Sequence, residues 1–458
     1  MKNVVFVALL AVFNFISIYS QNLTDYIVVD QFGYRPVSDK IAVIRDPQTG
    51  FDASASFTPG ASYALVNSSN DQQVFTAAPV VWNNGAEDTS SGDKAWWFDF
   101  SNYTTPGTYY ILDVANNVRS FEFEIRSDIY NEILKQAVRT FFYQRVGHAK
   151  ELPYAEASWA DGASHMGTLQ DPECRSYDAA TDATTQRDVS GGWYDAGDFN
   201  KYTNWTSNYI YEMLLAYGEN PEAWGDDYNI PESGNGIPDI IDEAKWGMDH
   251  LLKMQKSDGS MISIVDEDET SPPSAASGQS LYGAVNSSST WNSAGTFAYG
   301  AKIFESLGMS SYATILEQAA TNAWSWVVTN PNVIWRNNDA AYGSLGIGAG
   351  QQETDDYGRA MYRLRAAAHL YEITGTESYK TFFESNYTEA HLIAWGFVYP
   401  YETREQETLL YYTTISGAST NVVNDIMTRY NNSITSNEIN FPSYDNAVDP
   451  YRLSLIHI

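Results

Sequence analysis

Residues 191–203 read GGWYDAGDFNKYT, and this stretch carries more chemical information than any other part of the chain. Two carboxylates lie three residues apart in it, and the flanking glycines allow turns and close approaches that a Cβ atom would prevent. Acids at such a spacing are common on solvated surfaces, but here flat aromatic rings lie beside them. Carboxylates next to apolar faces suit a polar, uncharged, ring-shaped ligand such as a sugar. The candidate catalytic residues are Asp195 and Asp198, and the candidate substrate-binding residues are Trp193, Tyr194 and Tyr202.

The whole stretch closely resembles the catalytic-base signature of glycoside hydrolase family 9, a family of inverting cellulases and their relatives. Other segments resemble the same family in the expected order. They are PESGNGIPDIIDEAKWGMDHLLKMQ (231–255), after the base loop, and YNEILKQAVRTFFYQR (130–145), at the first catalytic helix. Upstream, VVDQFGYRP (28–36), FDFSNYTTPGTYYI (98–111) and RSFEFEI (119–125) resemble the immunoglobulin-like domain of one subgroup. The resemblance implies a multidomain fold, with an N-terminal immunoglobulin-like β-sandwich followed by an all-α (α/α)6 barrel.

Hydrophobic patterning divides the chain in the same way. Short apolar runs separated by turn residues predict a β-sandwich over 25–126. The runs are YIVVDQF, KIAVI, SYALV, APVVW, AWWFDF, TYYILDV and SFEFEI. From Asp128 onward apolar residues recur every three or four positions, which indicates helices. The predicted helices are 129–146, 205–218, 239–256, 294–307, 312–329 and 359–374. Periodicity alone predicts a large helical domain, and only the resemblance implies a barrel.

The N-terminus predicts export. Residues 1–20 contain a lysine, then an apolar run, then a serine before a polar residue, which is the layout of a secretory signal peptide. The apolar run is short for a bilayer span, and no later segment is apolar for long enough. We therefore expect a secreted, extracellular protein with no membrane association after signal cleavage.

The C-terminus departs from the family pattern. The segment DPYR (449–452) resembles a family segment beyond which the barrel continues to the general acid, a glutamate. We therefore expect the family 9 catalytic domain to occupy 128–452 in truncated form, with the barrel incomplete and 453–458 as a non-native tail. Glu438 lies in an Asn-Glu-Ile sequence like that of the acid, but it precedes DPYR and a proline follows shortly, so we do not assign it as the acid. Without this general acid, the polypeptide is expected to hydrolyse cellulosic substrates little or not at all.

Hydrolysis of a glycosidic bond requires an acid for the leaving oxygen and a base or nucleophile at the anomeric carbon. With inversion the two carboxyl groups stand about 6.5–9.5 Å apart, so that a water fits beside the sugar. Two acids on one short loop cannot flank a sugar from both sides, so Asp195 and Asp198 are better interpreted as a pair that holds one water. The resemblance implies that Asp198 is the general base, that Asp195 positions the water, and that the protein is an endo-β-1,4-glucanase acting on cellulose or a related β-glucan. Two alternatives stay open: a non-catalytic carbohydrate-binding or structural protein, and an exo-acting glucosaminidase of the same family.

Oxygen donors are concentrated between the base loop and the next predicted helix. Calcium binds six to eight oxygens of this kind, and several family members bind calcium. Negative side chains also favour a helix N-terminus, which explains part of the pattern without a metal. A structural calcium ion is therefore one of two explanations, and no organic cofactor is expected. The candidate metal ligands are Glu232, Asn235, Asp239 and Asp242.

The charge of the chain excludes one class of partner. A formal net charge of −31 is incompatible with nucleic-acid binding, which requires clustered lysine and arginine. A β-glucan polysaccharide is the expected partner. The acidic run Asp266–Glu269 is expected to be a solvated loop. Candidates for further sugar contacts are Trp205, Trp291 and Trp335.

Overall fold

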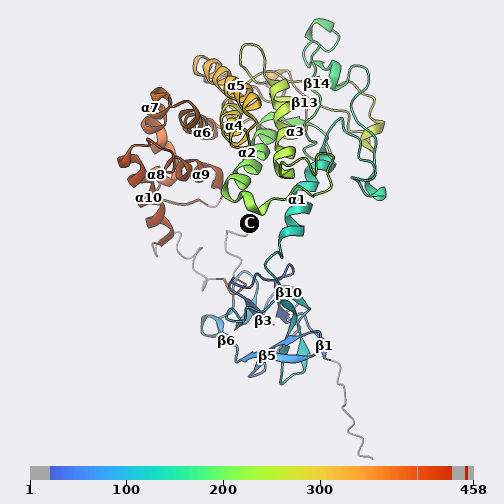
Figure 1. Ribbon diagram of the computed structural model, residues 1–458, viewed down its shortest axis with the longest axis vertical. Helices are drawn as coiled ribbons and strands as arrows, with labels where there is room; N and C mark the ends of the chain where they lie inside the picture. The colour runs from blue at the N-terminus through green and yellow to red at the C-terminus, as the bar shows by residue number, and fades with distance from the viewer. Residues whose placement is uncertain (1–20, 400, 436–448, 452–458) are drawn as a thin grey trace, which may run out of the picture. The chain divides into compact units, whose positions relative to one another are not determined.

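The computed structural model describes residues 21–399, 401–435 and 449–451, and in it the chain forms two compact units (Figure 1). The first unit ends at Tyr130 and also contains residues 449–451, and the second begins at Asn131. The expected signal peptide, Glu438 and the expected tail at 453–458 lie outside the described residues. Within the described ranges, every helix is too short or too polar to cross a bilayer.

The first unit is a β-sandwich. One sheet has the strand order β1-β9-β8-β4-β5, with β10 also paired to β8, and the other has the order β2-β3-β7-β6. The strands are β1 Asn22–Leu23, β2 Ile27–Val28, β3 Ile41–Pro47, β4 Tyr63–Asn67, β5 Gln72–Ala77, β6 Val80–Val81, β7 Asp93–Asp99, β8 Gly107–Asp113, β9 Val118–Arg119 and β10 Phe123–Ile125. Ile44 and Phe98 from one sheet share a core with Leu65 and Ile111 from the other. The predicted sandwich is confirmed, and each of the seven predicted runs contains a strand.

The second unit is helical. Its helices are α1 Asn131–Gln144, α2 Thr203–Glu219, α3 Asp239–Met254, α4 Ser287–Ser306, α5 Ser310–Thr329, α6 Asp356–Thr374, α7 Glu377–Asn386, α8 His391–Ala394, α9 Thr403–Tyr412 and α10 Thr420–Thr435. The six predicted helices correspond to α1 to α6, and the prediction did not include α7 to α10. In Figure 1, α2, α4, α5 and α6 form one packed group, and α3 lies against α2.

Helix α4 is the centre of this group, and most of its side chains are small. All residues from 287 to 301 are buried. A Cβ atom at Gly295 would lie 3.2 Å from the backbone nitrogen of Ala366 on α6, so glycine favours this close approach of the two helices. The helix begins at a good cap, since Asn286 Oδ1 accepts a hydrogen bond from the N–H of Ser289 at 3.0 Å. Helix α4 thereby fixes the positions of α2 and α6, which carry part of the candidate site.

A small sheet in the helical unit holds the end of the stretch 191–203. Its order is β11-β14-β13-β12. The strands are β11 Arg175–Ser176, β12 Lys201–Tyr202, β13 Ile264–Asp266 and β14 Leu281–Tyr282. Antiparallel pairing sets Lys201 opposite Val265 and Tyr202 opposite Ile264. Because α2 begins immediately after β12, the loop is anchored on both sides of its last residues.

Candidate active site

The base loop, residues 191–201, is shaped by two glycines and by a hydrogen bond between two of its own residues. Gly191 and Gly192 have φ values of +90° and +76°, in the left-handed region that favours glycine. A Cβ atom at Gly192 would lie 2.8 Å from Cδ2 of His250 on α3. Within the loop, the N–H of Asp195 donates to the carbonyl of Asn200 at 3.1 Å. This bond closes the loop on itself around Asp198.

Asp195 and Asp198 have different surroundings. The Tyr209 hydroxyl on α2 donates to Oδ1 of Asp195 at 3.0 Å. Both Asn200 Nδ2, at 3.1 Å, and the Tyr202 hydroxyl, at 2.7 Å, donate to Oδ2 of Asp198. Oδ1 of Asp198 is buried and accepts no hydrogen bond from a described residue. Burial and, to a smaller extent, the charge of Asp198 raise the pKa of Asp195, which the Tyr209 hydrogen bond opposes.

The hydroxyl of Tyr202 holds Asp198 in place. It accepts hydrogen bonds from the N–H groups of Ala349 at 2.9 Å and Gly350 at 2.8 Å, so its own proton is directed to Asp198. Burial, followed by the hydrogen bond to Asp198, raises the pKa of Tyr202 to about 12. The hydroxyl therefore stays protonated near neutral pH and remains a donor to the carboxylate.

The three aromatic residues predicted to contact substrate are buried instead. Trp193, Tyr194 and Tyr202 have exposed fractions of 3%, 5% and 1%. Their polar atoms find partners inside the protein: Trp193 Nε1 donates to Glu243 at 3.2 Å, and the Tyr194 hydroxyl is hydrogen-bonded to Ser164. Aromatic side chains of this size gain more from packing with a satisfied polar tip than from exposure. In this structure they support the base loop from behind, which differs from the expectation that they face a sugar.

An ion-pair cluster lies behind Trp193. Arg145 is fully buried between two glutamates, with its Nε 3.0 Å from Glu243 and its two terminal nitrogens each 3.0 Å from Glu232. Burial raises the pKa of Glu243 to about 7, and the guanidinium opposes this shift. Glu232, a candidate metal ligand in the sequence, is therefore held in a bidentate pair with an arginine 87 residues away.

A second buried cluster lies beneath the base loop. Lys201 Nζ is 2.5 Å from Asp171 Oδ2, 3.3 Å from Glu267 Oε1 and 3.1 Å from the carbonyl of Gly191. Burial would lower the pKa of Lys201, but the two acids raise it. The backbone N–H of Glu267 donates to Asn200 Oδ1 at 2.9 Å, so this cluster also orients the amide that donates to Asp198.

The expectation that Asp266–Glu269 forms a solvated loop is wrong for its first two residues. The Glu267 side chain is fully buried, with Oε1 3.3 Å from the ammonium of Lys201. Asp266 accepts a hydrogen bond from the N–H of Gly348 at 2.7 Å. Burial is the main reason that the pKa of Asp266 is raised to about 6, and the charge of Asp198 contributes. Asp266 is therefore a third carboxyl group in the electrostatic field of the candidate base.

A cavity of about 520 Å³ opens in front of Asp195. It is lined by Asp195, Trp205, Asn208, Tyr209, Gln351, Gln352, Glu353, Thr354, Tyr362 and Arg404. Most of these groups are polar, which suits a ligand with many hydroxyl groups. Trp205 lines the cavity as one of the predicted sugar contacts, whereas Trp291 and Trp335 are buried in apolar clusters.

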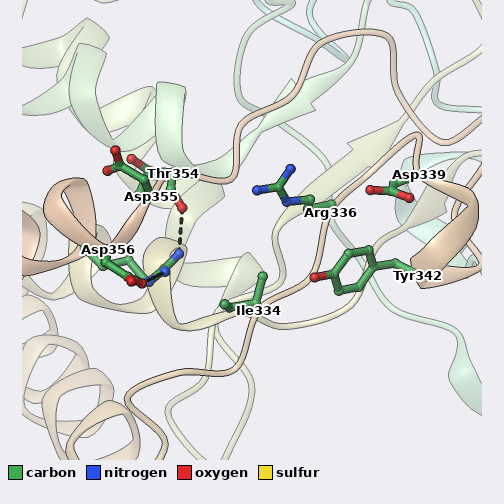
Figure 2. A pocket seen from close by; sticks show the side chains of 8 residues that line it. Ile334, Arg336, Asp339, Tyr342, Thr354, Asp355 and Asp356 are labelled. Atoms are coloured by element: carbon green, nitrogen blue, oxygen red, sulfur yellow. Dashed lines mark hydrogen bonds and ion pairs between the residues drawn. The ribbon is translucent and has the colours of Figure 1, made fainter.

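A second cavity, of about 440 Å³, adjoins the first at Thr354 (Figure 2). Its acids already have partners: Asp355 accepts from the N–H of Gly358 at 2.8 Å, and Asp356 pairs with Arg359. Figure 2 shows Ile334, Arg336 and Tyr342 across the cavity from Thr354, Asp355 and Asp356. Because the two cavities share Thr354 in their linings, they lie next to each other and together suit an extended ligand better than a compact one.

Three acids converge at the candidate metal site. One oxygen each from Asp226, Asp239 and Asp242 lies within 4.8 Å of the others. Oδ1 of Asp239 is buried without a hydrogen-bond partner among the described residues. Burial, with added repulsion from neighbouring acids, raises the pKa of Asp242 to about 7. A hard cation would satisfy the free oxygen and relieve this repulsion, so the residues fit a metal ion.

The cluster differs in part from the predicted ligand set. Asp239 and Asp242 belong to it, Glu232 pairs with Arg145 instead, and Asn235 contacts the cluster by donating to Asp242 at 3.1 Å. Asp226 was not predicted. It accepts hydrogen bonds from two backbone N–H groups of the glycine-rich turn that follows, at 2.6 and 2.7 Å.

Comparison with known proteins identifies the same two domains as the fold. Residues 130–454 match the model of glycosyl hydrolase family 9, and residues 23–117 match that of a cellulase N-terminal immunoglobulin-like domain. The chain is 32% identical over 389 residues to a cellulose 1,4-beta-cellobiosidase of Acetivibrio thermocellus, which covers 77% of this chain and 41% of that protein. It is 29% identical over 306 residues to endoglucanase C of Cellulomonas fimi, covering 62% of this chain and 27% of the relative. The chain thus spans less than half the length of these two relatives.

A solved structure extends the comparison to three dimensions. The crystal structure of a metagenome-derived family 9 endoglucanase superposes with a TM-score of 0.72 and 25% identity, covering 88% of this chain and 71% of that one. The family match covers more than half of the chain, and the order of an immunoglobulin-like sandwich and a helical (α/α)6-type domain agrees with it. The chain belongs to glycosyl hydrolase family 9.

Proposed function

We propose that the protein is a secreted, inverting endo-β-1,4-glucanase in which Asp198 is the general base and Asp195 positions the attacking water. The observation that carries this proposal is the free Oδ1 atom of Asp198. Its other oxygen is held by Asn200 and Tyr202, at 3.1 and 2.7 Å, so the carboxylate is fixed in orientation. The Oδ1 atom is buried, and as the one oxygen of Asp198 without a partner among the described residues it is the atom that would take the proton of a water admitted beside it.

Asp195 complements this geometry. Tyr209 occupies its Oδ1, and the residue lines the cavity, so its remaining oxygen is the one that would hold the water. Ionised carboxylates only accept hydrogen bonds, so two of them fix both protons of a water and direct its lone pair to the sugar. The acid that protonates the leaving oxygen must come from another element, because inversion places it across the sugar ring.

The substrate class is proposed from the shape of the site and from the relatives. The two adjoining cavities suit an extended chain, and the relatives named above are a cellobiosidase and an endoglucanase. We expect the full-length natural protein to release reducing sugar from carboxymethylcellulose and barley β-glucan, with a rapid fall in viscosity that marks internal cleavage. Release from chito-oligosaccharides alone would favour a glucosaminidase. Binding to insoluble cellulose without turnover of any of these substrates would favour a non-catalytic protein.

We also propose that the Asp226–Asp239–Asp242 cluster holds calcium. All its potential ligand atoms are oxygens, the donors that calcium prefers. Adding calcium to the chelator-treated protein is expected to raise its melting temperature, since a ligand at 100 times its Kd stabilises the folded state by about 2.7 kcal/mol.

The variant Asp226→Asn is expected to lose this response to calcium, whereas Glu389→Gln, at an exposed acid outside the cluster, should retain it. Differential scanning calorimetry with and without calcium measures both. Equal calcium-induced shifts in Asp226→Asn and in the unaltered protein would show that the ion binds elsewhere, and no shift in either would remove the calcium proposal.

A further inference from the structure

A buried arginine without an acidic partner lies beneath the floor of the cavity. Arg365, on α6, has an exposed fraction of 2%. Within 21–399, 401–435 and 449–451, no carboxylate lies at ion-pair distance from it, and its guanidinium is 4.4 Å from the ring centre of Tyr211 and 5.3 Å from that of Tyr362. Burying a charge is costly unless other groups solvate it. The hydrogen-bond acceptors around Arg365 must therefore keep their oxygen atoms directed at its guanidinium.

Those acceptors are two side-chain amides. A terminal nitrogen of Arg365 is 3.2 Å from Oδ1 of Asn208 and also hydrogen-bonds Oδ1 of Asn292. Asn292 in turn donates from Nδ2 to Oδ1 of Asn208 at 3.2 Å. A guanidinium has donors and no acceptor, so it determines which end of each amide faces it. The oxygen of Asn208 must therefore point into the protein, and its nitrogen must point away.

The nitrogen of Asn208 is directed to a residue of the cavity that contains Asp195. Asn208 and Tyr362 both line that cavity, and the Tyr362 hydroxyl lies 3.5 Å from Nδ2, at the outer limit of a hydrogen bond. Asn208 also directly precedes Tyr209, which holds Asp195. The floor of the cavity therefore offers an N–H donor whose hydrogen bond inside the protein, to Tyr362, is long and weak. This donor lies close to Asp195, the acid that is proposed to position water.

We propose that Asn208 is a substrate-binding residue that donates from Nδ2 to an oxygen of the sugar beside Asp195, and that Arg365 is a positioning residue that holds the amide in this orientation. The proposal rests on the proposed glycosidase function and adds to it a specific contact. The ligand is a neutral sugar unit with a hydroxyl or ring oxygen as acceptor. Arg365 acts only through the amide, since Asn208 separates it from the cavity.

The variant Asn208→Asp separates the two roles of the residue. A carboxylate at this position has the same shape, gives Arg365 an ionic partner and removes the N–H donor. We expect its melting temperature to equal or exceed that of the unaltered protein. In full-length protein carrying Asp198→Asn to prevent turnover, its Kd for cellotetraose should rise about tenfold, the effect of losing one hydrogen bond of about 1.4 kcal/mol.

A second variant tests the role of Arg365. Asn208→Leu keeps a similar volume but removes the acceptor, so the buried guanidinium loses a partner and the melting temperature should fall clearly below that of Asn208→Asp. Asn322→Asp, on the exposed side of α5, is the matched control for the amide-to-acid change and should alter neither quantity. Calorimetry gives the melting temperatures, and titration calorimetry gives the Kd.

Unchanged cellotetraose binding in Asn208→Asp would overturn the proposed contact. A melting temperature of Asn208→Asp as low as that of Asn208→Leu would overturn the role of Arg365. If the Asp198→Asn protein with Asn208 intact bound no β-glucan, the proposed function and the sugar contact would fall together. The comparison of melting temperatures would still decide whether Arg365 orients the amide.

Discussion

Replacing Asp198 with asparagine is expected to lower the kcat of the full-length natural protein on β-glucan by about 10²–10⁴-fold, the usual effect of losing a positioned general base. The amide keeps the shape of the carboxylate and can still accept hydrogen bonds from Asn200 and Tyr202 through one oxygen. It cannot take a proton from water. The rate of reducing-sugar release, measured beside the melting temperature, distinguishes this loss from unfolding.

Glu222→Gln provides the control, because Glu222 is an exposed acid of the same unit outside both cavities. It should keep the rate of the unaltered enzyme. If Asp198→Asn retained more than a tenth of that rate, Asp198 would not be the base.

Replacing Lys201 with methionine is expected to destabilise the helical unit by about 3–5 kcal/mol, because it leaves two buried acids without their cation. Asp171 and Glu267 are both fully buried against the ammonium. A change of this size should lower the melting temperature by on the order of 10 °C. It should also weaken catalysis in the protein that still folds, since Lys201 binds the carbonyl of Gly191 at the start of the base loop.

Lys256→Met is the matched control, because Lys256 is exposed and its ammonium lies within 4.0 Å of no carboxylate among the described residues. Its melting temperature should stay within about 1 °C of that of the unaltered protein, as is usual for surface substitutions. A similarly small change in Lys201→Met would show that the buried cluster does not hold the loop.

The strands that the sequence predicted are those with continuous apolar runs between turn residues. The strands β3, β4, β7 and β8 carry apolar side chains into a shared core, and β4 and β8 also bury their other face, so each is visible as an apolar run. Strand β5, Gln72–Ala77, was missed because it pairs only with β4, half of its residues are polar and none of them is buried. Helix α9 was missed because its first residues, Thr403 to Glu407, are almost all polar. Tertiary packing of the last residues stabilises it instead.

The sequence predicted where the acids of the candidate site lie, but not the hydrogen bonds that hold the side chains around them. The motif located Asp195 and Asp198, yet it could not show whether Trp193 and Tyr194 face a ligand or the interior, since both positions favour aromatic residues. The structure shows the interior, because Glu243 on α3 and Ser164 supply polar partners at their tips. These partners are far away in sequence, so no local pattern could reveal them.

Long-range partners also explain the revised metal cluster. Glu232 had the right chemistry for a ligand, but Arg145 lies beside it in the fold and holds both its oxygens. Asp226 completes the cluster from a turn five residues before the segment 231–255, which contains the predicted ligands. The one available signal was the pairing of an acid-rich turn with a glycine-rich turn, which brings backbone N–H groups to Asp226.

The anomeric configuration of the first product tests the central claim most directly. If Asp198 activates a water that attacks from the face opposite the leaving group, a β-1,4-glucan must give the α-anomer first. Proton NMR of cellotetraose, recorded in the first minutes after adding the full-length natural protein, should show the α-anomer signal of the new reducing end growing ahead of mutarotation. Initial release of the β-anomer would mean net retention, and would contradict a base-activated water at Asp198.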